Sequence, residues 1–200
     1  MSFSTREAQS FFAPLRGRTA TFLLDDRPAN LDFARSVIGL LAQTKNTAEI
    51  FDLDAFYASN ADHIFRSLGS PTVATIRVPE PGAEIEEEFA SIFEGNQGVV
   101  IVDSLNSFFH LLSQDDEGSR SRKLTFAIAG LAYLARTNSK AVILSMYRRE
   151  SFTRWGIGRS ISGLSDITAS VDARGRELII RAERGPGWEG GVFSIRIPSE

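Results

Sequence analysis

The run GVVIVD at residues 98–103 constrains the fold of this chain more than any other stretch of its sequence. Its aliphatic residues follow one another without a polar position between them, so a strand of this composition has no side to present to solvent. Such strands are typical of a parallel sheet that helices cover on both faces. The runs TATFLL at 19–24 and KAVILSM at 140–146 have the same character and predict two further strands of that sheet.

Apolar residues at helical spacing alternate with these strands. One stripe runs from Leu31 to Leu41 and predicts a helix that ends near Thr44, and another runs from Leu124 to Leu134 within a long helix. The remaining patterns predict a strand from residue 48 that ends in carboxylates at Asp52 and Asp54, a strand at 72–78, and helices around 60–68 and 85–93. The alternation predicts an α/β fold whose functional edge lies at the carboxyl ends of the strands.

The C-terminal part of the chain has a different pattern. Three short strands, SDITASVD, RELIIRAE and GGVFSIRI, are separated by the turn sequences ARG and RGPGWEG. Short strands with such turns predict an antiparallel β meander on one edge of the sheet, over about 164–197. With 42% hydrophobic residues in a chain of 200, we expect a single domain over 1–200, with a lead-in over about 1–17.

Composition excludes several classes of function. A formal net charge of -3 argues against a protein that coats nucleic acid by bulk charge, although a local basic patch remains open. The chain has no cysteine, which excludes disulfides, thiolate catalysis and cysteine-ligated zinc. His63 and His110 are the only histidines and are better explained as ordinary side chains than as ligands, so no metal site is expected. The sequence predicts neither a signal peptide nor a membrane span, and hence a cytoplasmic protein.

The order of these elements resembles the RecA/RadA recombinase superfamily of P-loop ATPases. The closest resemblance is to the short archaeal RadB-like proteins and RadA paralogues, which consist of the core domain alone. It covers roughly residues 15–197, and its most specific part is VVIVDSLNSFF, which is similar to the Walker B strand of the family and the turn after it. The resemblance implies a RecA-like core, a mainly parallel sheet flanked by helices, with the C-terminal β meander.

The segment FLLDDRPANLDFA at 22–34 has the order of elements of a phosphate-binding loop: an apolar strand, a polar connector of eight residues and the start of a helix. A working loop, G-x-x-x-x-G-K-[ST], needs glycines for close backbone approach, a lysine for charge and a hydroxyl for magnesium. Aligning that motif with residues 25–32 gives Asp25 and Asn30 at the glycines, Leu31 at the lysine and Asp32 at the hydroxyl. We therefore expect a degenerate Walker A motif, no ATPase activity, no catalytic residue and no nucleotide cofactor.

Other positions of the family's site are partly kept. The resemblance places Asp103 where the Walker B aspartate supports magnesium. It places Asp54 where the family has a glutamate that orients the attacking water, and the side chain of Asp54 is one methylene shorter than that glutamate. It places Ser145 and Met146 at the strand end where recombinases carry an Asn-Gln sensor pair. From the residues alone, Asp54 and Asp103 are better explained as solvated ends of strands.

A basic loop, YRRESFTRWGIGRSIS, follows at 147–162. Its candidate binding residues are Arg148, Arg149, Phe152, Arg154, Trp155 and Arg159. Arginines neutralise phosphates and aromatic rings stack on unpaired bases, and the matching segment of the recombinases lies along single-stranded DNA. Two alternatives stay open: an interface with a protein partner, where Trp, Tyr and Arg are the usual anchors, and a lid over the nucleotide site. A second basic cluster at 120–123 follows three acidic residues, which favours local helix capping there.

These features predict a catalytically inactive RecA/RadA paralogue that acts as an accessory factor in homologous recombination and DNA repair. It would bind single-stranded DNA, a RecA/RadA-type recombinase, or both, and would be nucleoid-associated if it binds DNA. The alternative is a pseudo-ATPase subunit with a structural or regulatory role in a multiprotein assembly, Elongator-like or KaiC-like. The only match to the Phe-x-x-Ala docking segment of RadA filaments, Phe126 to Ala129, is expected in the core. A monomer or dimer is therefore expected rather than a filament.

Overall fold

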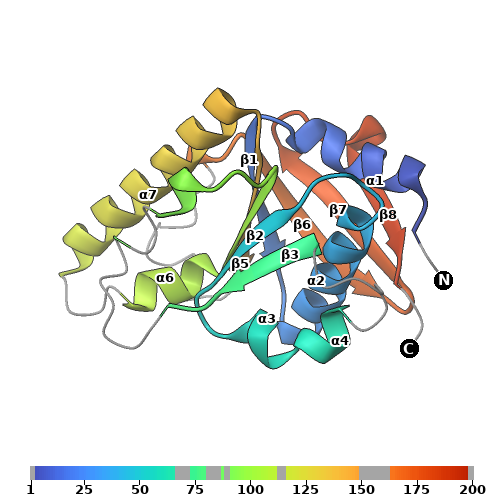
Figure 1. Ribbon diagram of the computed structural model, residues 1–200, viewed down its shortest axis with the longest axis horizontal. Coiled ribbons are helices and arrows are strands. Elements are labelled where there is room, and N and C mark those ends of the chain that lie inside the picture. The colour runs from blue at the N-terminus through green and yellow to red at the C-terminus, as the bar shows by residue number, and fades with distance from the viewer. Residues whose placement is uncertain are drawn as a thin grey trace.

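An eight-stranded sheet with the order β3-β2-β4-β5-β1-β6-β7-β8 forms the centre of the structure, a computed structural model (Figure 1). It describes residues 3–65, 73–79, 87, 91–111, 116–148 and 163–197. The strands are β1 (Arg18–Leu24), β2 (Ala48–Asp52), β3 (Ala74–Arg77), β4 (Val99–Asp103), β5 (Ala141–Tyr147), β6 (Ile167–Arg174), β7 (Glu177–Arg184) and β8 (Val192–Arg196).

The strands from β1 to β6 are parallel to one another, as the apolar runs predict. β5 lies between β1 and β4, and β4 pairs with β2 so that Asp103 lies beside Asp52 at the carboxyl ends of the two strands. The predicted antiparallel meander is also present, as β6, β7 and β8. It is continuous with the parallel sheet, because β6 pairs in parallel with β1.

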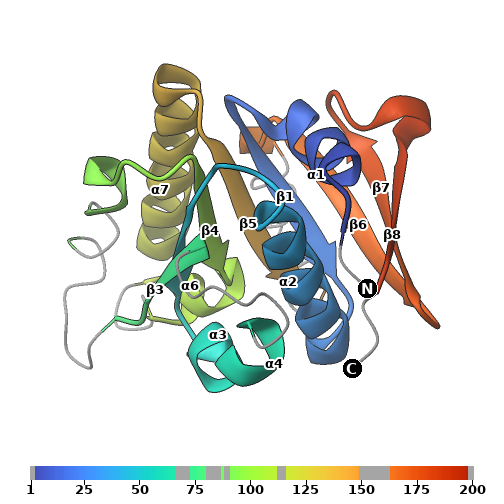
Figure 2. The same ribbon diagram turned by 45° about the vertical axis from the view of Figure 1, so that its right-hand side comes forward.

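Helices cover both faces of the sheet (Figure 2). They are α1 (Thr5–Phe12), α2 (Arg27–Leu41), α3 (Phe56–Ser59), α4 (Ala61–Phe65), α6 (Leu105–Leu111) and α7 (Glu117–Asn138). Short 3-10 turns occur at η1 (Ala13–Leu15), η3 (Ser91–Glu94) and η4 (Glu189–Gly191). Helices α1 to α4 pack on one face and α6 and α7 on the other, so that β4 contributes Val99 and Ile101 to one core and Val100 and Val102 to the second.

Several predicted elements differ from the observed ones. The helix expected around 60–68 is represented by the two short helices α3 and α4 in the described residues. Most of the helix expected over 85–93 lies outside the described residues. The long helix is present as α7, and its predicted stripe is buried, from Leu124 to Leu134. The expectation that Phe126 and Ala129 belong to the core is wrong: both are exposed, with Phe126 at 81%.

Candidate functional site at the carboxyl edge of the sheet

The turn between β1 and α2 is much shorter than the sequence suggests. Only Asp25 and Asp26 separate the strand from the helix, which begins at Arg27, so the expected eight-residue connector is wrong. Asp26 is the N-cap residue and its carboxylate accepts a 2.8 Å hydrogen bond from the backbone N–H of Ala29. Pro28 lies in the first turn of the helix, where its fixed backbone angle is favourable. These two local signals start the helix earlier than the alignment with a phosphate-binding motif implies.

This early start changes what the N-terminus of α2 can bind. A phosphate-binding loop presents several backbone N–H groups to an anion at the positive end of a helix. In this chain, one of these N–H groups already donates its hydrogen bond to the carboxylate of Asp26. A turn of two residues also lacks the length to wrap around a phosphate.

The four residues aligned with the Walker A motif have separate environments. Asp25 is exposed in the turn, and Leu31 is partly buried against the core under α2. Asp32 is partly buried, and this burial raises the pKa of its carboxyl, while the charge of Arg35 opposes the rise. Asn30 is fully buried and is the only one of the four that reaches the end of β4.

Asn30 joins a buried polar network around Asp103, which is itself fully buried. The side-chain amide of Asn30 donates hydrogen bonds to Asp103 Oδ2 at 3.0 Å and to the Tyr147 hydroxyl at 2.8 Å. Ser145, at the end of β5, donates its hydroxyl to the other carboxylate oxygen of Asp103. Asp103 is therefore not a solvated end of a strand. Both of its oxygens are held by side chains from α2 and β5.

Two further carboxylates lie close to Asp103. Carboxylate oxygens of Asp52, Asp54 and Asp103 lie within 4.8 Å of one another. Asp52 is fully buried and accepts a 2.8 Å hydrogen bond from the backbone N–H of Ala58 in α3. Asp54 is the least buried of the three, and Ser107 of α6 donates its hydroxyl to it at 3.3 Å. The structure thus brings Asp54 and Asp103 together at the carboxyl edge of the sheet.

Burial dominates the electrostatics of this cluster. It raises the pKa of Asp103 to about 7, and the nearby charges of Asp54 and Asp52 add to the rise, while the hydrogen bonds from Ser145 and Asn30 oppose it. Burial also raises the pKa of Asp52 and of Asp54. The cluster is thus a place where negative charge is unfavourable and where a proton is retained to near-neutral pH.

Carboxylates in this arrangement are the ligands that hard divalent cations prefer. Asp52 Oδ1 and Asp54 Oδ1 have no hydrogen-bond partner in the part of the chain that the structure describes, so they remain available. Asp103, in contrast, uses both oxygens for hydrogen bonds to Ser145 and Asn30. A cation here would be held mainly by Asp52 and Asp54 and would supply positive charge to a buried acidic cluster.

Only the first candidate residue of the basic loop, Arg148, lies in the described part of the chain. Its guanidinium donates to Glu183 Oε1 of β7 at 2.7 Å and lies 3.9 Å from Asp25 Oδ1. Its backbone N–H donates to Leu24 O at 2.8 Å, which fixes it at the end of β1. The other candidate residues lie outside the described residues: Arg149, Phe152, Arg154, Trp155 and Arg159.

One of the acidic residues before the second basic cluster has the expected capping role. Asp116 caps α7 by accepting a 3.0 Å hydrogen bond from the backbone N–H of Ser119. The guanidinium of Arg120 lies 4.8 Å above the ring centre of Phe109 in α6. Helix capping and packing thus account for this end of α7.

Residues that the sequence analysis did not select also build the site. The side chain of Asn106 bridges to the backbone of Tyr147, accepting from its N–H at 2.8 Å and donating to its carbonyl at 3.4 Å. Asp26 could have been found from the spacing of an N-cap residue before an early proline. Asn106 and Tyr147 have no such local signal, because their contact joins the start of α6 to the end of β5, which are far apart in sequence.

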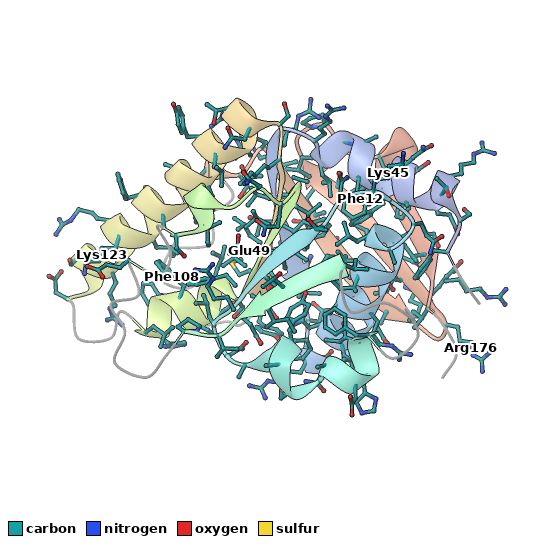
Figure 3. The ribbon with its side chains drawn as sticks, viewed as in Figure 1. Phe12, Lys45, Glu49, Phe108, Lys123 and Arg176 are labelled. Carbon is teal, nitrogen blue, oxygen red and sulfur yellow. The ribbon has the colours of Figure 1, made fainter. Side chains whose placement is uncertain are left out.

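A separate groove of about 510 Å³ lies at the opposite edge of the sheet, where β4 and β5 begin. It is lined by Gln9, Phe12, Ala13, Arg16, Asn46, Gly98, Val99, Asn138, Ser139 and Ala141. Phe12 projects from α1 on this side of the molecule (Figure 3). The carboxylate cluster and this groove are therefore distinct features of the two edges.

Comparison of the chain with models of known protein families gives no match, and neither does comparison with curated proteins. The fold and the site define the class: an α/β protein with a mostly parallel sheet, an antiparallel extension and an acidic cluster at its carboxyl edge, compatible with a Rossmann-type or RecA-like fold. In the described residues, none of the helices combines the length and the apolar character that crossing a membrane requires.

Proposed function

We propose that this chain is a catalytically silent RecA-like domain that acts by binding other macromolecules. The observation that carries the proposal is the β1–α2 turn, where Asp26 caps the helix and Asn30 fills the space beside Asp103. In a P-loop ATPase the corresponding turn would hold the phosphates. Here it holds carboxylates, and each unit of like charge a few ångströms from a phosphate costs on the order of 1–4 kcal/mol.

Isothermal titration calorimetry with ATP and Mg²⁺ tests the absence of a nucleotide site. We expect no saturable heat at millimolar nucleotide and no release of phosphate above that of buffer. Saturable binding that is lost in an Asp103→Asn variant would show a nucleotide site at this edge and would overturn the proposal. Asp116→Asn is the matched control, because Asp116 caps a helix outside the carboxylate cluster.

As the role of this silent domain, we propose an accessory factor in homologous recombination that binds single-stranded DNA or a recombinase. The order of strands and helices and the arginines and aromatics of 147–162 support this role. Arg148, the first arginine of that segment, lies at the carboxyl edge, with 40% of its side chain exposed. Its pairing with Glu183 means that a phosphate must compete with a carboxylate for the guanidinium, so we expect binding in the micromolar range and strong salt dependence.

Fluorescence anisotropy of a labelled single-stranded oligonucleotide, titrated from low to physiological salt, tests this role. We expect binding that weakens steeply with salt and is lost when Arg148, Arg149 and Arg154 are changed together to alanine. The control changes Arg6, Arg16 and Lys45 to alanine, which removes the same charge at exposed positions on α1 and on the connectors before β1 and β2; Lys45 is labelled in Figure 3. Equal loss in both variants would indicate non-specific charge attraction and contradict a DNA site on the loop.

The second candidate is a pseudo-ATPase subunit of a larger assembly that does not bind DNA. The observation that favours it is the exposed apolar surface on α7, where Phe126 is 81% and Tyr133 67% exposed. This candidate predicts a defined oligomer and no anisotropy change even at low salt.

A further inference from the structure

Helix α7 exposes apolar residues along the middle of its outer face. It lies along the outside of the molecule, with the sheet on its inner side (Figure 1). Its inner stripe, from Leu124 to Ala135, is buried. On the opposite side, Phe126 is 81% and Tyr133 67% exposed. Seven residues rotate a helix by nearly two full turns, so these two rings point in directions only roughly 20° apart.

The same part of α7 lacks charge. The segment LTFAIAGLAYLA, from Leu124 to Ala135, contains no charged residue, although it has one face in solvent. A solvated helix face usually carries charged or polar side chains. Two exposed aromatic rings separated by the small residues Ala129 and Gly130 are instead the composition of a surface that another helix covers.

The order of residues on this face is symmetrical. Phe126 and Tyr133 are equally distant from the midpoint between Ala129 and Gly130. Two copies of such a helix, aligned antiparallel about that midpoint, place Phe126 of each against Tyr133 of the other, and the small residues meet at the centre. A two-fold interface requires this self-complementarity, whereas a different partner protein does not. We propose that α7 pairs antiparallel with α7 of a second copy of this chain.

The charges at the two ends of the face are compatible with this pairing. Arg122 is one turn before Phe126, and in the antiparallel alignment it lies near Arg136 of the second copy. Arg136 donates to Asp166 Oδ1 at 3.1 Å, so a carboxylate already accompanies its charge. One pair of helices buries less surface than a standard stable interface does, so we expect a weak dimer that dissociates on dilution.

The absence of cysteine allows a sharp test, because a single introduced cysteine is the only thiol in the chain. In the proposed dimer the two copies of Ala129 are adjacent, within the Cα separation of about 4.4–6.8 Å that a disulfide needs. The two copies of Arg122 are about 22 Å apart along the helices, at 1.5 Å per residue. Under mild oxidation, Ala129→Cys should form a covalent dimer about ten-fold faster than the control Arg122→Cys, which reports random collisions.

Sedimentation of the unmodified chain over a range of concentrations provides the second measurement. We expect a shift from the 22.0 kDa monomer towards twice that mass, which Phe126→Glu abolishes. Val192→Glu is the control, because Val192 is a 44% exposed apolar residue on β8 and should leave the shift unchanged. A chain that stays monomeric at submillimolar concentration, or equal cross-linking of the two cysteine variants, would overturn the proposal. A hetero-partner would then be the occupant to seek.

Discussion

At the scale of single residues, the environment of Asp103 has a measurable consequence. Its carboxyl has a pKa of about 7 in the folded chain, against 3.8 for an unperturbed aspartate, mainly because it is buried. A group whose pKa is raised on folding binds its proton more tightly in the native state. The free energy of unfolding is therefore lowered progressively as the pH rises from about 4 to about 7, and the loss is complete above that range.

We predict that Asp103→Asn removes this pH dependence. An amide carries no charge and keeps the shape of the carboxyl, so the variant should gain stability relative to the unmodified chain between pH 5 and pH 8, on the order of 1–4 kcal/mol. Urea unfolding at the two pH values measures the difference. Glu177→Gln, at an exposed position, serves as the control, and its free energy of unfolding should change with pH as that of the unmodified chain does. If the free energy of unfolding of Asp103→Asn changed with pH as much as that of the unmodified chain, the prediction would be contradicted.

The candidate residues at this edge were only partly accessible to sequence analysis. Asp54 and Asp103 could be placed together because each follows a predicted strand and parallel strands end at one edge. The role of Asn30 could not be foreseen, since its partners Asp103 and Tyr147 come from strands over seventy residues away. A polar residue on an amphipathic helix looks solvated until the neighbouring strands are known.

At the scale of elements, the start of α2 shows how a motif alignment can mislead. Residues 25–32 have the length of a phosphate-binding loop, but Asp26 and Pro28 are the strongest local signals in that stretch and they begin a helix. In α7 the difference from the expectation lies in which side of the helix a residue faces. Phe126 lies roughly 200° around the helix from the buried Leu124, so the stripe itself predicts exposure of Phe126. The apolar character of Phe126 favours the core, whereas its position on the helix decides that it is exposed.

We predict that Asp26→Ala destabilises the protein by about 1 kcal/mol, because the N–H of Ala29 loses its acceptor. Asp26→Asn should retain most of the stability, since asparagine is an equally good N-cap residue. Chemical denaturation of the two variants beside the unmodified chain measures the effect. Equal losses in the two variants would show that the charge of Asp26, and not its hydrogen bond, stabilises this end of α2.

At the scale of the whole molecule, the sheet brings the two ends of the chain together. Phe11 of α1 stacks on Trp188, which follows β7, with ring centres 5.9 Å apart. The indole N–H of Trp188 donates to Phe11 O at 3.1 Å. The class of the fold could be predicted from the apolar runs, but the order of the strands could not, because it depends on contacts between distant segments. The packing of α1 against the meander could not be predicted for the same reason.

We predict that Phe11→Ala lowers the free energy of unfolding by about 3–5 kcal/mol, because it removes a fully buried ring from the core. Phe126→Ala, at the exposed face of α7, should change it by less than about 0.5 kcal/mol in the monomer. Urea denaturation at low protein concentration measures both. Fluorescence of Trp188 in a Trp155→Phe background should shift only for Phe11→Ala.

The position of β1 in the middle of the sheet has a consequence for biosynthesis. Both of its neighbours, β5 and β6, are encoded far downstream, and β6 ends at Arg174, 150 residues after Leu24. At about 5–20 residues per second, the ribosome needs roughly 8–30 s to synthesise the chain from the end of β1 to the end of β6. During that interval an apolar strand has emerged without its partners. A nascent chain of this protein should therefore need shielding by a chaperone, and one that stops before β6 should not reach the native state.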